Sequence, residues 1–343
     1  MNEKFQNALR RVPQAVPPVW FMRQAGRYHK HYQALRAKHS FIEMCKDPKL
    51  AAEVALGPVL DFDYDVSILF SDLLFPLEAM GMGLKYDPAP ELDWQLNHET
   101  LPKLRPVHEA LPELEFQKLA MQETRKVLPK NKSLIGFVGG PWTLFTYAVE
   151  GSHKGGLEGA KKNLNLFEPF CDVLVPLLIE NIRLQFEGGA EVVMLFDTAA
   201  GELSPRVYRE VVVPALEALA NAYPNRLGYY AKGIQGAHLQ DDLFKGSAAS
   251  SFAGLGFDHR WEMSEVLVEI DSKGFKQGNF DQSLLFMSEN ELKAQALKYL
   301  EPIRKLKLEQ RAGWVSGLGH GVLPGTPENN VRTLINLIRE VMA

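Results

Sequence analysis

Eight short apolar segments recur along the 343-residue chain, and each is short enough to be one buried strand. Stretches with the 3.6-residue periodicity of amphipathic helices lie between most of them, for example 167–186, 206–222, 290–300 and 327–342. Strand and helix alternating eight times predict an α/β fold with a parallel sheet closed into a (β/α)₈ barrel. The predicted strands are 19–22, 66–70, 134–138, 191–196, 227–230, 252–257, 275–278 and 313–318.

A doubly wound open sheet is the alternative, but eight strand–helix units in a chain of this length favour the closed barrel. The spacing is irregular only at 84–106, where several prolines predict an excursion from the barrel. Fixed-period repeats, low-complexity tracts and Gly/Ser-rich linkers are absent from the sequence. We therefore expect residues 1–343 to form one TIM-barrel domain, with the active site at the C-terminal ends of the strands.

Charge and cysteine content exclude several classes of protein. Thirty-eight basic and 42 acidic residues give a formal net charge of −4, whereas nucleic-acid binding normally needs a basic excess. Cys45 and Cys171 lack the Cys-x-x-Cys spacing of zinc and redox sites, so we expect buried, reduced thiols. Because no apolar run approaches 18 residues and none follows Met1, we expect a cytoplasmic protein without membrane association.

In a parallel barrel, every strand delivers its last residue to the same face of the molecule. The residues that end the eight segments are almost all polar, although Asp and Asn at such places also serve as helix caps. Together they form a candidate active site that consists of Arg23, Asp72, Gly139, Asp197 with Thr198, Lys232, Asp258, Asn279 with Asp281, and His320.

Arg23 and Arg27 lie four residues apart on either side of Gly26, directly after the first predicted strand. Guanidinium groups bind carboxylates and phosphates in a fork-like geometry, so we expect an anionic ligand. Asp72 is an acid in an otherwise apolar run, 67–76, that would keep water away from it. It either caps the following helix or, as a desolvated acceptor, binds ligand N–H groups or stabilises a developing cation.

Gly139 and Gly140 end a strand and open a helix, whose free N–H groups can bind an anion. Tyr147 shares a face of that helix with Thr143. Its hydroxyl either points into the cavity or is satisfied within the core.

Gly317, Gly319 and Gly321 alternate where the chain leaves the last predicted strand, which indicates close approach of the backbone to another group. His320, between two of them, is either structural or a carboxylate partner or proton donor. His29 and His31 resemble a metal-binding pair, but they fall beyond the strand end, so no metal site is expected there.

The chain resembles the uroporphyrinogen decarboxylase family nearly end to end. The segments that carry this resemblance are 18–28 (PVWFMRQAGRY), 68–72 (ILFSD) with 79–84 (AMGMGL), 136–144 (GFVGGPWTL), 277–281 (QGNFD) and 318–321 (LGHG). The first and third of these are the most specific signatures.

The resemblance implies a homodimeric (β/α)₈ barrel that uses no metal or prosthetic group. It implies that the ligand is uroporphyrinogen, whose four acetate side chains are decarboxylated to methyl groups, giving coproporphyrinogen in haem biosynthesis. The implied catalytic residues are Asp72, Arg23 and Tyr147. The implied substrate contacts are Arg23, Gln24, Arg27, Asp72, Tyr147, Thr198 and His320.

The general acid stays open in this reading, because a guanidinium is a poor acid at neutral pH. Arg23 is the candidate by position. Its rivals are Asp72, Tyr147, His320 and a bound water molecule.

Four positions depart from the family pattern. Ala199 stands where an aromatic residue is common, and Gly317 where asparagine usually precedes Leu-Gly-His-Gly. His259 replaces a frequent tryptophan, and Gln282 a usual proline. None is among the assigned site residues, so we expect effects on ligand packing, isomer preference, rate or dimer contacts.

Two other functions share parts of this pattern. Corrinoid-dependent methyltransferases have the same fold, but they bind zinc through a His-x-Cys arrangement, which neither Cys45 nor Cys171 forms. A non-enzymatic tetrapyrrole-binding protein would keep the arginines and could lose the acid, so the presence of Asp72 favours an enzyme.

Overall fold

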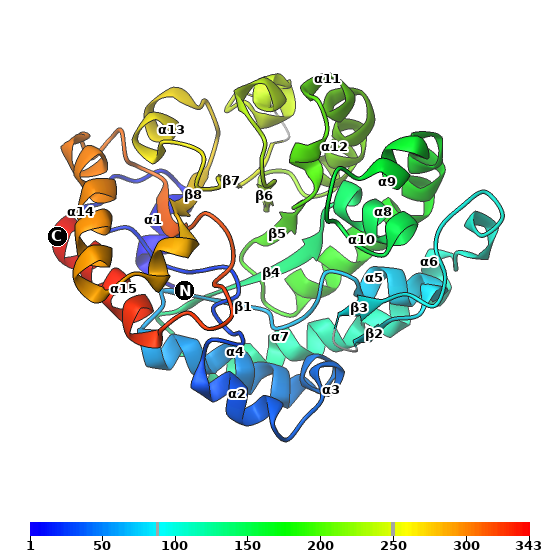
Figure 1. The fold of residues 1–343 in the computed structure, drawn as a ribbon, viewed down its shortest axis with the longest axis horizontal. Coiled ribbons are helices and arrows are strands. Elements are labelled where there is room, and N and C mark those ends of the chain that lie inside the picture. Colours follow the sequence, from blue (N-terminus) through cyan, green and yellow to red (C-terminus); the bar gives the residue numbers. More distant parts are fainter. Residues whose placement is uncertain (87–88, 248–250) are drawn as a thin grey trace.

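A curled parallel sheet of seven strands forms the centre of the protein, with helices around its outside (Figure 1). The computed structural model describes residues 1–86, 89–247 and 251–343. Neighbouring strands follow the order β1-β4-β5-β6-β7-β8-β9. Their bounds are β1 Val66–Ile68, β4 Ser133–Gly139, β5 Val193–Phe196, β6 Leu227–Tyr230, β7 Gly254–Gly256, β8 Phe275–Phe280 and β9 Trp314–Leu318.

The eighth place in the ring belongs to the first predicted strand, which is reduced to a single parallel bridge between Val19 and Ser316. On one side, Trp20 N–H donates to Ser316 O at 3.3 Å and Ser316 N–H donates to Pro18 O at 2.9 Å. On the other side, Asp65 N–H donates to Val19 O at 2.9 Å. The segment thus lies between β9 and β1, as the closed barrel requires. Pro18 has no N–H to pair, which shortens this strand at its start.

Helices connect the strands on the outside of the ring. Their bounds are α1 Glu3–Leu9, α2 Lys30–Arg36, α3 Phe41–Lys46, α4 Pro48–Phe62, α5 Phe75–Leu77, α6 Val107–Ala110, α7 Glu115–Val127, α8 Pro141–Glu150, α9 Glu158–Lys162, α10 Phe167–Glu187, α11 Pro205–Val207, α12 Val213–Ala222, α13 Met263–Glu269, α14 Glu289–Lys305 and α15 Glu328–Met342. The helices predicted over 167–186, 290–300 and 327–342 are confirmed as α10, α14 and α15.

The helix predicted over 206–222 is interrupted. It forms α11, a π-helical turn at Tyr208–Val212, and then α12. Pro214 lies just after this turn and offers no N–H to the preceding carbonyls, which favours the wider turn.

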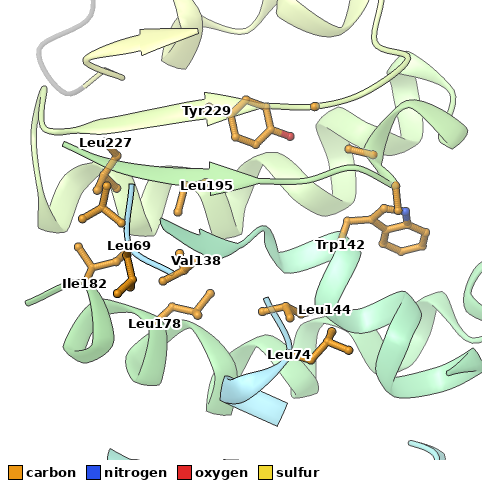
Figure 2. Close-up of a cluster of buried hydrophobic side chains, with 14 of the residues drawn as sticks. Leu69, Leu74, Val138, Trp142, Leu144, Leu178, Ile182, Leu195, Leu227 and Tyr229 are labelled. Atoms are coloured by element: carbon orange, nitrogen blue, oxygen red, sulfur yellow. The ribbon is translucent and has the colours of Figure 1, made fainter. Parts of the chain in front are cut away.

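Side chains that point outward from the strands pack under the helices (Figure 2). Val138 of β4 and Leu195 of β5 lie in this layer with Leu178 and Ile182 of α10, and all four are at most 3% exposed. Burial of such a side chain stabilises a fold by about 1.5–3 kcal/mol relative to exposure. Trp142 of α8 belongs to the same layer, so the helix that carries Tyr147 is firmly anchored.

The alternate residues of the same strands point into the barrel. Met194 and Phe196 of β5 form this inner core with Val315 of β9. Helix α1 fills the N-terminal end, where the ring of Phe5 lies 6.0 Å from that of Phe275. Because this end of the barrel is packed with side chains, the chemistry belongs at the C-terminal ends of the strands.

The predicted excursion at 84–106 is confirmed. Strands β2 (Lys85–Tyr86) and β3 (Pro90–Glu91) pair antiparallel in a separate two-stranded sheet beside α5 (Figure 1). Residues 87–88, which the sequence places in this excursion, lie outside the described residues. Trp94 Nε1 donates to Gly81 O at 3.1 Å and ties the excursion to the main body.

Both cysteines are free thiols, but they differ in burial. Cys45 is fully buried, as predicted, and desolvation raises the pKa of its thiol well above the usual value. Cys171 on α10 is only half-buried, so that expectation holds in part. Within the described ranges, no helix is both long and apolar enough to cross a bilayer.

Candidate active site

Arg23 lies in a tight turn directly after the first barrel segment. Its φ is +59°, in the left-handed region that non-glycine residues enter at a cost of about 1–3 kcal/mol. Gln24 stabilises this turn: its Oε1 accepts from Phe21 N–H at 3.3 Å and its Nε2 donates to Val66 O at 3.1 Å. The amide of Gln24, which the family resemblance assigns to the substrate, is therefore bonded to backbone and positions Arg23.

The glycines after β9 leave room for other parts of the same protein. A Cβ on Gly321 would lie 2.5 Å from Arg23 Cδ, and one on Gly319 would lie 2.4 Å from His259 N. The close approach predicted from these glycines is confirmed, and protein groups make it. Gly321 in particular lets the Arg23 side chain lie flat against the last loop.

Gly317, one of the departures from the family pattern, packs against Gln277. A Cβ at this position would lie 2.0 Å from Gln277 Nε2. An asparagine here would therefore force Gln277 to move. Ala199, another departure, is 1% exposed, and its N–H donates to Thr143 Oγ1 at 3.0 Å.

Asp72 lies on the loop between β1 and α5. Its Oδ1 accepts the Leu74 N–H at 2.9 Å, so the cap-type bond predicted as one alternative is present. Desolvation raises the pKa of this half-buried carboxyl above its usual 3.8, while the Leu74 N–H, the Tyr86 hydroxyl and the Arg23 charge lower it. Because the cap uses Oδ1, the second carboxylate oxygen is left for other donors.

Tyr86 of β2 was not predicted as a site residue. Its ring packs edge-on against Phe41, with centroids 4.8 Å apart, and its buried hydroxyl has no partner at regular hydrogen-bond geometry among the described residues. That hydroxyl nevertheless lies close enough to Asp72 to lower the pKa of the carboxyl. The sequence offers no signal for this contact, because the excursion that carries Tyr86 follows no regular pattern.

We expect Tyr86→Phe to move the acidic limb of the pH–activity profile to higher pH. The Tyr86 hydroxyl favours the ionised form of Asp72, so its removal raises the pKa of that carboxyl further above 3.8. The measurement is kcat/KM as a function of pH. Tyr223→Phe is the control, because the Tyr223 hydroxyl donates to Ile179 O on α10, outside the barrel. An unchanged acidic limb in Tyr86→Phe would contradict this assignment.

Asp197 fills the N-terminus of α8. Its Oδ1 accepts from both N and Oγ1 of Thr143, each at 2.7 Å. A Cβ on Gly140 would lie 2.4 Å from Asp197 Cβ, so this glycine serves the contact. From the sequence, this helix terminus can bind an anion, and the anion found there is the protein's own carboxylate. Burial raises the pKa of Asp197 to about 6, against the effect of the Thr143 bonds.

Thr143→Val is expected to destabilise the fold by about 1–3 kcal/mol, because a buried carboxyl loses a hydroxyl donor. Unfolding in urea measures the free energy of unfolding. Thr124→Val is the matched control: Thr124 is equally buried, but its hydroxyl donates to Ala120 O within the same helix. Equal losses in the two variants would argue against a special role of the Asp197 contact.

Tyr147 is half-buried near the end of α8, and its hydroxyl lies 2.6 Å from Nδ1 of His153. Burial raises the pKa of Tyr147 to about 12; the negative charge of Asp72 adds to the rise and Arg23 opposes it. The Tyr147 phenol is therefore neutral at physiological pH, and it can donate and accept hydrogen bonds without carrying a charge.

His320 and Thr198 each present an unused polar atom. Thr198 Oγ1 and His320 Nδ1 are buried without a hydrogen-bond partner in the described residues. The His320 ring stacks on Tyr230, with centroids 6.2 Å apart. Burial, followed by the charges of Arg23 and Lys232, lowers the pKa of His320 to about 3, so this ring is a neutral imidazole at pH 7.

Arg23 is the residue that joins these groups into one site. Its positive charge lowers the pKa of side chains from several parts of this face, namely Asp72, Tyr147, His153, Tyr230 and His320. Lys232 was predicted as a strand end but not as a site residue. Its charge lowers the pKa of both His153 and His320. Arg27 is exposed, and its charge lowers the pKa of Tyr32, which lies at the margin of this cluster.

The remaining strand ends are structural. Asp258 accepts from Gly233 N–H at 2.6 Å and pairs with Arg260 at 2.5 Å. Asn279 Nδ2 donates to Asp258 O at 2.8 Å, and Asp281 Oδ1 accepts from Ser283 N–H at 2.8 Å. These residues connect and cap the loops.

The histidines after Arg27 are engaged elsewhere. His29 Nε2 pairs with Asp61 at 2.7 Å, and His31 Nε2 lies 3.2 Å from Glu53 O. Over the described ranges, no group of three or more His, Cys, Asp and Glu side chains is arranged to hold a metal ion.

Residues 1–341 match the family described as uroporphyrinogen decarboxylase (URO-D). The chain belongs to this family. Curated uroporphyrinogen decarboxylases similar to it include one from Chlorobium phaeobacteroides, 31% identical over 99% of this chain and 97% of the relative. Another, from Crocosphaera subtropica, is 34% identical over 95% of this chain and 92% of the relative.

Solved structures extend the likeness in fold. A methyltransferase from Methanosarcina mazei superposes with a TM-score of 0.80 over 99% of this chain and 98% of that one, at 21% identity. A putative vitamin-B12-independent methionine synthase from Listeria monocytogenes gives a TM-score of 0.56 at 11% identity, over 96% and 98% of the two chains. At these identities the likeness concerns the fold alone. This chain thus shares its architecture with proteins that carry other names.

Proposed function

We propose that this protein decarboxylates uroporphyrinogen III to coproporphyrinogen III, converting each acetate side chain to a methyl group in haem biosynthesis. Membership of the uroporphyrinogen decarboxylase family over the whole chain supports this reaction. The observation that carries the proposal is a desolvated carboxyl, Asp72, that shares one site with a cation, Arg23, whose charge lowers the pKa of that carboxyl. The substrate has the complementary groups, because it combines pyrrole N–H donors with a rim of carboxylates.

The substrate supplies its own electron sink. A pyrrole is electron-rich, so a proton can add to the ring carbon beside the position that carries the acetate. The electrons of the C–CO₂ bond then flow into the cationic ring, and carbon dioxide leaves. The exocyclic methylene takes up a proton to become methyl, and the ring carbon returns the proton it gained. Each acetate thus consumes one proton and releases one carbon dioxide.

The site residues fit the two opposite charges in this reaction. In our proposal, Asp72 accepts the pyrrole N–H groups and stabilises the cationic ring, while Arg23 and Arg27 bind carboxylates of the substrate. Tyr147, Thr198 and His320 contact the substrate with neutral hydrogen-bonding groups. A pKa of about 12 for Tyr147 and about 3 for His320 weighs against both as the general acid at neutral pH.

The test is turnover of uroporphyrinogen by purified, chelator-treated protein under anaerobic conditions, followed by mass. Stepwise loss of carbon dioxide from the four acetates is the expected result. Loss of activity with the chelator and recovery with zinc would instead indicate a metal enzyme. Binding without a change in mass would indicate a passive tetrapyrrole-binding protein.

We also propose that residues 1–343 act as one domain in a cytoplasmic homodimer that binds neither nucleic acid nor membranes. The family resemblance supports the dimer, and the net charge of −4 supports the absence of nucleic-acid binding. Light scattering of the purified protein measures its mass in solution. A monomer at micromolar concentration would contradict the homodimer.

A further inference from the structure

Tyr147 has a partner that the sequence did not indicate. His153 lies on the loop between α8 and α9, and its Nδ1 is 2.6 Å from the Tyr147 hydroxyl. The two rings also pack against each other, with centroids 5.1 Å apart. Which of the two atoms donates depends on the tautomer and the protonation of His153. The state of this histidine therefore decides where the Tyr147 proton points.

The surroundings of His153 are cationic. Groups from the turn after the first barrel segment, from the loops after β6 and β9, and from its own loop face it, namely Arg23, Lys232, His320 and Lys154. Burial above all, and then the charges of Arg23, Lys232 and Lys154, lower the pKa of His153 below its usual 6.5. In the free protein at pH 7 the ring is neutral, because both causes disfavour the imidazolium.

The hydrogen bond reverses direction when His153 gains a proton. In the neutral ring with a proton on Nε2, Nδ1 accepts the Tyr147 hydroxyl, and the Tyr147 proton points away from the ligand site. In the imidazolium, Nδ1–H donates to the Tyr147 oxygen, and the Tyr147 proton is free to point into the site. Ligand carboxylates bound beside Arg23 and Lys232 favour the imidazolium, because a nearby opposite charge stabilises the charged form of a titratable group and raises the pKa of a histidine.

We propose that His153 is a ligand-dependent proton acceptor: binding of the polycarboxylate tetrapyrrole draws one proton from solvent onto Nδ1, and the Tyr147 hydroxyl then donates to the ligand. The proton returns to solvent when the ligand leaves, so the reaction stoichiometry is unchanged. His153 is a positioning residue that acts through Tyr147. This inference rests on the proposed function, because the carboxylates of the substrate supply the charge.

Calorimetry tests the proton uptake. Uroporphyrin, the oxidised and unreactive form of the substrate, is titrated into the protein near pH 7 in buffers of different ionisation enthalpy. We expect the wild type to take up more protons than His153→Gln, up to one per bound ligand, because glutamine keeps a hydrogen bond to Tyr147 but does not titrate. The comparison is repeated between His320→Gln and the double variant His153→Gln/His320→Gln, because neither of these can take up a proton on His320. Equal uptake with and without His153 would overturn the proposal.

His108→Gln is the matched control, because the His108 side chain is 80% exposed. Its proton uptake should equal that of the wild type. The pH profile of kcat/KM adds a readout that a merely structural role would not move. His153→Gln should lose one titration step on the basic side, and His108→Gln should keep it.

Proton NMR of the unsubstituted protein keeps the inference testable if His153→Gln does not fold. The ring C2 proton of His153 is identified by its contact with Tyr147, and its pKa is expected to rise by about 1 or more with uroporphyrin. An unchanged pKa, or no binding of uroporphyrin at all, would overturn the inference. Binding with proton uptake but no decarboxylation would refute only the proposed function, whereas decarboxylation without uptake would refute only the inference.

Discussion

Asp72→Asn is expected to lower kcat by about 100- to 1000-fold, because a preorganised charge at the reacting centre typically contributes that much. In the proposed mechanism the carboxylate faces a ring that becomes cationic in the transition state, and an amide offers no charge to stabilise that ring. Asparagine keeps the oxygen that accepts the Leu74 N–H, so the local turn survives. Anaerobic turnover gives kcat, and thermal unfolding shows that the variant is folded.

The matched control for this substitution is Asp241→Asn. Asp241 Oδ1 accepts the Leu243 N–H at 3.0 Å in the same two-residue turn, but among residues of the outer helices. Both variants should unfold at nearly the same temperature as the wild type. Wild-type turnover in a folded Asp72→Asn protein would refute the role proposed for this carboxyl.

Arg23→Met is expected to lower kcat/KM by about 100-fold, because hydrogen bonds to charged groups contribute about 1.5–3 kcal/mol and a bound carboxylate loses its fork-like partner. The substitution also removes the cation that lowers the pKa of Asp72, so that pKa rises and the acidic limb of activity moves to higher pH. The pKa of His320 rises as well, because Arg23 is one cause of its depression. Steady-state kinetics across pH measures all of these effects.

Arg27→Met provides the comparison. Arg27 is exposed, as Arg23 is, but its charge acts on Tyr32 and not on Asp72, so its loss should raise KM by about 10-fold or less and leave the acidic limb unchanged. Equal losses in the two variants, or a larger loss in Arg27→Met, would contradict the central position assigned to Arg23. The two residues, which look equivalent in the sequence, should therefore separate in kinetics.

Much of the fold follows from short-range patterns. Seven of the eight predicted strands occur, because runs of apolar residues of strand length have few other ways to bury their side chains. The eighth, at Val19, keeps its place in the ring but loses its length. The helix over 206–222 is interrupted ahead of Pro214, a consequence of backbone chemistry that apolar periodicity does not register.

The candidate site is likewise only partly predictable from the sequence. Arg23, Asp72 and His320 are found from position alone, because parallel strands bring their C-terminal ends to one face. Gln24 and Asp197 lie at that face as well, but their polar groups are used by Phe21, Val66 and Thr143. Its position at a strand end places a side chain on this face. That position does not show whether the polar group of the side chain is already hydrogen-bonded to another part of the protein.

The amino-acid sequence by itself determined the alternation of strands and helices, and with it the ring of polar residues at one end of the barrel. Only the tertiary structure decided that Tyr86 reaches Asp72 and that His153 reaches Tyr147. The physical reason is that both contacts depend on the paths of irregular segments. Those paths are set by packing against distant parts of the chain rather than by local periodicity.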